Sequence, residues 1–142
     1  MRKLLVPFDG SKSALHALQY AIKLAKQNKL MSIHVVHAHE EPVIYGEIEV
    51  YISREKMADL QRQHSNDVLA IAEKLLEKAA VPHTKEILIG PIAQVIARRA
   101  HALHCDSIVM GTRGLTAIGK LVIGSVATKM VHLANVPVTL VK

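Results

Sequence analysis

The sequence predicts an α/β fold, a doubly wound α/β sandwich in which four helices cover a five-stranded, mostly parallel sheet. Its 142 residues are the size of one ordinary domain. Half of the residues are apolar but only 3% are aromatic, so the core must be built from aliphatic side chains. Short apolar runs alternate with segments of helical periodicity along the chain. This alternation is typical of a parallel sheet with helices on both faces.

Five apolar runs predict the strands. Each run is continuous rather than alternating, which is typical of a strand that is buried on both faces. Turn residues follow three of them directly, Asp9 after the first, Gly90 after the third and Gly111 after the fourth. The predicted strands are residues 4–8, 33–37, 86–89, 107–110 and 137–141.

Four segments with apolar residues at every third or fourth position predict the helices. Ser11 and Ser13 precede the first helix as possible caps, and Ser125 can cap the fourth. Pro91 suits the first position of the third helix, since proline lacks the N–H that would be unpaired there. The predicted helices span about residues 14–28, 51–79, 91–103 and 126–133, with Pro82 ending the second.

Composition and charge argue against several classes of protein. A single cysteine, Cys105, allows neither an internal disulfide nor a cysteine-based zinc site, and we expect a cytoplasmic protein. The apolar run at the amino terminus stops at Asp9, too soon for a signal peptide or a membrane span. The net charge is +6, and residues 107–142 contain no acidic residue. That quarter of the chain favours an anionic ligand, whereas nucleic-acid binding would rest on net charge alone and is disfavoured.

A glycine-rich segment between the fourth strand and the fourth helix is the strongest candidate site. Glycines allow the backbone to approach a ligand closely, and the following helix offers free N–H groups to a phosphate. In a parallel sheet this segment lies at the carboxyl ends of the strands, where ligands bind. Its pattern is Gly-x2-Gly-x9-Gly-Ser, formed by Gly111, Gly114, Gly124 and Ser125.

Two other phosphate-binding motifs do not fit. Gly114, Gly119 and Lys120 have the spacing of a Walker A motif, but Leu121 stands where a hydroxyl should hold magnesium. No G-x-G-x-x-G follows the first strand, so the dinucleotide fingerprint is absent from the sequence.

With this loop, the sequence resembles the universal stress protein family, specifically its ATP-binding branch. The resemblance extends along the chain, through residues 6–11, 107–114, 124–127 and 137–138. It implies one nucleotide-binding domain over residues 1–142, with ATP and Mg²⁺ as ligands. Phe8 departs from the family, which usually has a smaller aliphatic residue there.

The resemblance also implies individual roles. Pro7, Phe8 and Asp9 would lie along the nucleotide, with Asp9 near the ribose or a phosphate-bound Mg²⁺. Val36 and Met110 would lie near adenine. The residues implied near the ribose and phosphates are Gly111, Arg113, Gly114, Gly124, Ser125 and Val126.

Each role has a structural alternative. Asp9 can simply cap the first helix, and the glycines can be turn residues without a ligand. A lone loop arginine such as Arg113 is usually solvated, and Val36 and Met110 are core residues by default.

The histidines and the cysteine give little indication of a catalytic or metal site. His34, His37 and His39 cluster near the second strand, but only the last two share a face, so we expect surface or capping roles rather than a zinc site. Cys105 is expected to be a small buried residue, not a nucleophile. No set of residues spaced for nucleophilic catalysis is indicated.

The favoured function is that of a cytoplasmic ATP-binding stress-response regulator or adaptor. No catalytic base is identifiable, so slow ATP hydrolysis is the most that we expect. A nucleotide-independent dimeric interaction module is the first alternative. An enzyme of the adenine nucleotide α-hydrolase-like group ranks lower, because residues 9–13 contain one glycine where a glycine-rich loop is needed. The last strand should lie at a sheet edge and form a homodimer, which the family resemblance also implies. The sequence does not identify a protein partner.

Overall fold

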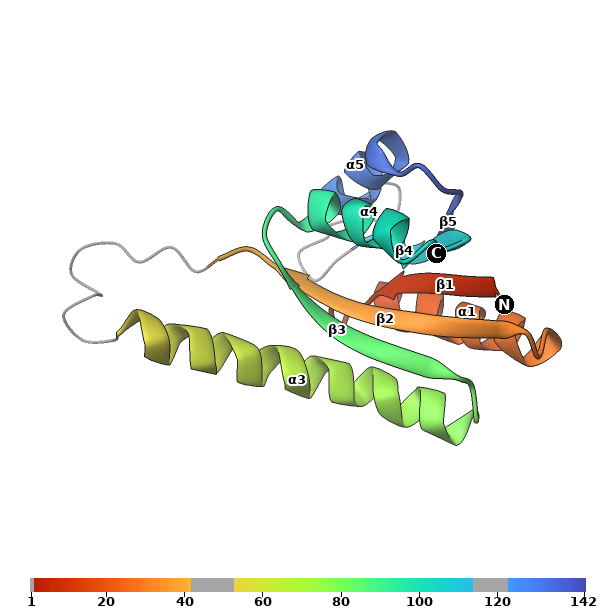
Figure 1. Cartoon of the computed structure of the whole chain (residues 1–142), viewed down its shortest axis with the longest axis horizontal. Coiled ribbons are helices and arrows are strands. Elements are labelled where there is room, and N and C mark those ends of the chain that lie inside the picture. The colour runs from red at the N-terminus through yellow and green to blue at the C-terminus, as the bar shows by residue number, and fades with distance from the viewer. Residues whose placement is uncertain (1, 42–52, 114–122) are drawn as a thin grey trace.

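The computed structural model describes residues 2–41, 53–113 and 123–142. Within these residues, strands and helices alternate as the sequence predicts (Figure 1). The strands are β1 (Arg2–Pro7), β2 (Met31–His39), β3 (His83–Ile89), β4 (Ser107–Gly111) and β5 (Val138–Val141). The helices are α1 (Lys12–Gln27), α3 (Arg54–Lys78), α4 (Ile92–Ala102) and α5 (Ser125–Leu133).

The sheet is parallel in every pair of neighbouring strands, where the sequence predicted a mostly parallel one. The strand order is β3-β2-β1-β4-β5, so β1 is central and β3 and β5 are the edges. Along the chain, β2 and β3 are added on one side of β1, and β4 and β5 are then added on its other side. The strand order therefore reverses between β1 and β4, where parallel α/β sheets bind ligands.

Several helix and strand boundaries differ from the predicted ones. β3 begins at His83, three residues before the predicted start, because backbone pairing with β2 requires no apolar side chain. Pro91 is the N-cap of α4 and not its first helical residue. Gly124 is the N-cap of α5, so the prediction that Ser125 caps this helix is wrong. Ser53, which the sequence analysis missed, caps α3 by accepting a hydrogen bond from the Lys56 N–H.

Two cores lie on the two faces of the sheet, and β1 contributes to both. Leu4 and Val6 pack on the face covered by α1 and α3, whereas Leu5 packs on the face covered by α4 and α5. Alternating side chains of a strand point to opposite faces, so a central strand needs apolar residues at every position. This explains the continuous apolar runs in the sequence.

Two of the β2 histidines are buried, so the predicted surface or capping role is wrong for them. His34 Nδ1 lies 2.6 Å from Thr84 Oγ1, and its Nε2 lies 2.9 Å from the Glu86 carboxylate. His37 Nδ1 lies 2.9 Å from Ser65 Oγ on α3. Burial is tolerated because these ring nitrogens have hydrogen-bond partners.

Cys105 is buried, as predicted, and burial raises the pKa of its thiol. The thiol therefore stays protonated at neutral pH and is a poor nucleophile. Among the helices that the structure describes, none combines the length and the apolar character that a membrane span needs.

Candidate functional site

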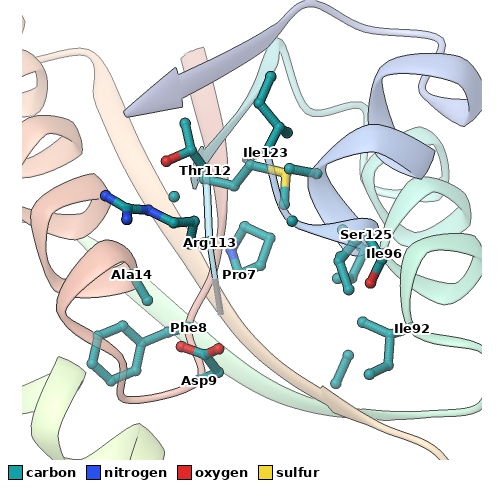
Figure 2. Close-up of a pocket in the computed structure, with 16 residues that line it drawn as sticks. Pro7, Phe8, Asp9, Ala14, Ile92, Ile96, Thr112, Arg113, Ile123 and Ser125 are labelled. Atoms are coloured by element: carbon teal, nitrogen blue, oxygen red, sulfur yellow. The ribbon is translucent and has the colours of Figure 1, made fainter. Parts of the chain in front are cut away.

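A cavity of about 410 Å³ lies at the carboxyl ends of β1 and β4, where the strand order reverses (Figure 2). Residues from both cores, from the β1–α1 turn and from the amino-terminal ends of α4 and α5 line it. The lining residues are Pro7, Phe8, Asp9, Ala14, Ala38, Ile92, Ile96, Met110, Gly111, Thr112, Arg113, Ile123, Gly124, Ser125, Val126 and Ala127.

The β1–α1 turn places the Asp9 carboxylate on the cavity wall. Gly10 has a φ of +84°, a backbone conformation that glycine adopts without strain. Asp9 Oδ1 accepts a hydrogen bond of 2.9 Å from the Ser11 N–H. Ser11, rather than Asp9, caps α1, because its hydroxyl accepts from the Ala14 N–H. The alternative that Asp9 caps this helix is therefore wrong, although Asp9 does stabilise the turn.

Gly111 allows α1 to pack directly against the end of β4. A Cβ atom at Gly111 would lie 2.7 Å from the backbone carbon and oxygen of Ser13 and would also overlap the Ser13 hydroxyl. That hydroxyl accepts a hydrogen bond of 3.1 Å from the Arg113 N–H. Gly111 thus has a packing role that is independent of any ligand. Ser13, in the first turn of α1, thus joins this helix to the residues that follow β4, a contact that the sequence analysis missed.

The amino-terminal end of α5 lines the cavity. The Gly124 N–H donates a hydrogen bond of 2.6 Å to the Thr112 carbonyl, which ties the start of α5 to the end of β4. Gly124 has no side chain with which to cap the helix. The N–H groups of Ser125, Val126 and Ala127 belong to the first turn, whose amides have no acceptor within a helix. Together with the helix dipole, they form an environment that attracts an anion.

The side of the cavity formed by α4 and β4 is apolar. Ile92 and Ile96 of α4 border the cavity (Figure 2). Met110 of β4 also lines it. Ile96 and Met110 belong to the core beneath α4 and α5, so this wall is held in place by packing. The cavity therefore combines an apolar wall with amide groups, the Arg113 side chain and one carboxylate.

Comparison with known proteins gives the family. The sequence profile of the Universal stress protein family matches residues 1–142. The chain belongs to the universal stress protein family. Universal stress protein MJ0531 of Methanocaldococcus jannaschii is 32% identical over 143 residues, which cover 99% of this chain and 82% of that protein. Universal stress protein YxiE of Bacillus subtilis is 29% identical, with 99% of this chain and 98% of that protein covered.

Solved structures of universal stress proteins share the fold. The structure of protein MJ0577 superposes with a TM-score of 0.85 at 26% identity, covering 99% of this chain and 95% of that one. The universal stress protein of Archaeoglobus fulgidus, solved in complex with dAMP, has a TM-score of 0.73 at 21% identity, with 100% and 98% covered. A family member from Arabidopsis thaliana, solved with AMP bound, also has a TM-score of 0.73, at 20% identity, with 100% and 92% covered.

The structure brings together most of the site residues that the sequence suggested. Val36 is an exception, because it is completely buried in the core and Ala38, two residues along the same face of β2, lines the cavity instead. Gly114 lies outside the described residues. Phe8 is both a core residue and a wall of the cavity. The suggested residues that line the cavity are Pro7, Phe8, Asp9, Met110, Gly111, Arg113, Gly124, Ser125 and Val126.

Sequence reasoning missed the contribution of α4. Ile92 and Ile96 fit the apolar stripe of a helix that packs on a sheet, and this pattern does not distinguish a core position from a cavity wall. The one available signal was position, since Ile92 directly follows the turn Gly90–Pro91 at the carboxyl end of β3.

Proposed function

We propose that this universal stress protein binds an adenine nucleotide in the cavity, specifically ATP with Mg²⁺, as a member of the ATP-binding branch. The observation that carries the proposal is the meeting of an apolar wall with the amino-terminal end of α5 in one cavity of about 410 Å³. An adenine ring suits the apolar wall, and phosphates suit helix amides. The dAMP and AMP complexes of two proteins with the same fold support an adenine nucleotide as the ligand.

The proposed roles follow the chemistry of the lining groups. Met110, with Ala38 in place of Val36, would contact adenine. The amides of Ser125 and Val126 would hold phosphates, and Arg113 would add a positive charge. Asp9 fits a magnesium site, because Mg²⁺ is commonly bound by one or two carboxylates together with phosphate oxygens. Its Oδ1 accepts one turn hydrogen bond, which leaves Oδ2 for the metal.

We further propose that the chain acts as one cytoplasmic domain, a stress-response regulator or adaptor rather than a fast enzyme. Among the described residues that line the cavity, Asp9 is the single carboxylate and no histidine is present. Phosphoryl transfer to water requires a positioned nucleophile in addition to charge neutralisation. A carboxylate occupied by Mg²⁺ is a poor base, so hydrolysis is expected to be slow.

Two measurements test the nucleotide proposal. Mass spectrometry identifies any nucleotide released from protein purified without added ligand, and calorimetric titration compares ATP, ADP and AMP with and without Mg²⁺. We expect bound ATP and an affinity that Mg²⁺ increases. An empty protein that also fails titration would favour the nucleotide-independent interaction module.

Asp9→Asn tests the magnesium role. Asparagine keeps the size of the side chain and an acceptor for the Ser11 N–H, but it removes the negative charge. We expect the gain in ATP affinity that Mg²⁺ provides to shrink, while affinity without metal changes less. If thermal stability falls sharply and the magnesium dependence is unchanged, the role of Asp9 is confined to the turn.

We also propose a homodimer formed through β5. This strand is at the sheet edge, where its outer backbone groups lack a strand partner within the described sheet. Replacing Val138 and Leu140 with lysine should produce monomers in sedimentation equilibrium. Because both side chains also pack on the core beneath α4 and α5, Thr139→Lys is a milder companion. A monomeric parent, or folded variants that all remain dimeric, would exclude β5 as the interface.

A further inference from the structure

Two carboxylates and an imidazole converge where the chain turns from α3 into β3. Glu73 and Glu77 are four residues apart in α3 and therefore lie on one face of the helix. His83 is the first residue of β3. One ligand atom from each side chain lies within 4.8 Å of the other two. The group is at the amino-terminal end of β3, the opposite end of the parallel sheet from the cavity (Figure 1).

The backbone that carries this group is fixed by hydrogen bonds and packing. The Ala80 N–H donates to the Glu77 carbonyl at 3.0 Å, and the Val81 N–H donates to the Leu76 carbonyl at 3.1 Å. Val81 is buried in the core. The Pro82 carbonyl accepts from the Ile33 N–H of β2, which ties the start of β3 to the sheet. A site built on such fixed elements is better defined than one on a loop.

The hydrogen bond of His83 prepares its ring to bind a metal. His83 Nδ1 lies 2.7 Å from the Val81 carbonyl oxygen. A carbonyl can only accept, so the proton is on Nδ1, and in the neutral ring the lone pair is on Nε2. Histidines that bind metals usually donate their other ring N–H to a carbonyl or carboxylate in this way. The same bond fixes the orientation of the ring.

A cation already neutralises part of this group. Lys85 Nζ lies 3.0 Å from Oε1 and 2.9 Å from Oε2 of Glu73. Glu73 and Glu77 bring two acidic side chains to one lysine, and like charges four residues apart on a helix repel each other. The group therefore keeps a net negative charge that a divalent cation would neutralise.

We propose that Glu73, Glu77 and His83 bind one Zn²⁺ ion, which links α3 to β3. One imidazole nitrogen with two carboxylate oxygens suits Zn²⁺, whereas Mg²⁺ and Ca²⁺ prefer sites made of oxygen alone. Zinc bonds of about 2.1 Å place tetrahedral ligands about 3.4 Å apart. Rotation of the two glutamate side chains closes the remaining gap, and water takes the fourth position.

Zinc titration of the full chain by calorimetry, with competition by a chelator, tests the site. We expect His83→Gln to weaken the tightest zinc site at least about tenfold, because loss of a residue that only orients a ligand already costs about 10–100-fold. Lys85→Met should strengthen binding several-fold, because the competing ammonium is gone. The chain has nine histidines, so His16→Gln, an exposed position on α1, is the matched control and should bind as the parent does.

The melting temperature tests whether Zn²⁺ links α3 to β3. Saturating Zn²⁺ should raise the melting temperature of the parent and of His16→Gln but not that of His83→Gln, since a ligand stabilises only the state that binds it. Glu77→Gln, on the exposed face of α3, gives the same test if His83→Gln does not fold. Unchanged zinc affinity in both ligand variants, or equal losses in the His16 control, would overturn the proposal. Nucleotide binding is measured separately, because this site does not depend on the cavity.

Discussion

The two faces of the sheet are covered by helices of very different length. On one face, α1 has 16 residues and α3 has 25, and on the other, α4 has 11 and α5 has 9. At 1.5 Å per residue, α3 is about 37 Å long and α5 about 14 Å. The nine residues of β2 extend about 30 Å. α3 is therefore longer than β2, whereas α5 is less than half as long as that strand.

The cavity lies at the beginning of the two short helices. α4 and α5 both begin at the carboxyl ends of the strands, and residues from their first turns line the cavity. Neither helix has a side-chain cap at its start, whereas α1 and α3 are capped by Ser11 and Ser53. The starts of α1 and α3 are thus closed by serine side chains, whereas the uncapped starts of α4 and α5 border the cavity.

Large-to-small substitutions on the two faces give the largest expected effect. Leu69 on α3 and Ile96 on α4 are both 1% exposed, but only Ile96 lines the cavity. We expect Leu69→Ala to cost about 3–5 kcal/mol of unfolding free energy and Ile96→Ala about 2 kcal/mol, because a side chain beside empty space has fewer packing partners. Urea unfolding measures both. A larger loss for Ile96→Ala would contradict the contrast between the faces.

Substitution at Gly124 separates binding from folding. Gly124 has an ordinary extended backbone (φ −61°, ψ 159°), so a side chain is tolerated there and the cost to the fold should stay near 1 kcal/mol. We expect Gly124→Val to weaken ATP binding at least about tenfold, because its branched side chain would enter the space proposed for the phosphates. Calorimetric titration measures the affinity, and Gly124→Ala is the smaller control. A folded valine variant with unchanged affinity would contradict this placement of the phosphates.

The smallest expected effect is a pH dependence of folding stability, caused by His37 on the face covered by α1 and α3. Burial lowers the pKa of His37, and the neighbouring His64 and His39 lower it further, while Asp9 opposes them. The unfolded chain therefore binds a proton at His37 near pH 6.5, whereas the folded chain binds it only at lower pH. Stability from this residue is present above that pH and is lost as the pH falls below it.

Comparison of unfolding at about pH 7.5 and about pH 5.5 checks this dependence. His37→Gln should lose less stability over this range than the parent. His16→Gln, at an exposed position, should follow the parent. An unchanged slope in the His37 variant would show that its burial does not govern the acid response.

The sequence by itself determined the α/β architecture and most of the residues around the cavity. Continuous apolar runs mark strands that are buried on both faces, and helical periodicity marks the segments between them, because each pattern reflects a local repeat of the backbone. The carboxyl ends of parallel strands lie at one edge, so the residues following β1 and β4 had to lie near each other. This is why Asp9 and the glycine-rich segment after β4 could be placed at one edge of the sheet from the sequence, whereas Met110 was suggested by the family resemblance.

Only the tertiary structure decided which residues share a wall, a core or a cluster. Ala38 replaces Val36 at the cavity, and Ile92 and Ile96 join it, because the placement of α4 over the sheet depends on packing between distant segments. Likewise, His34 and His37 are buried beside partners 50 and 28 residues away in the sequence, Thr84 and Ser65. Local periodicity contains no information about such contacts. They arise when the two cores pack, and they determine which polar groups satisfy each other and which remain for a ligand.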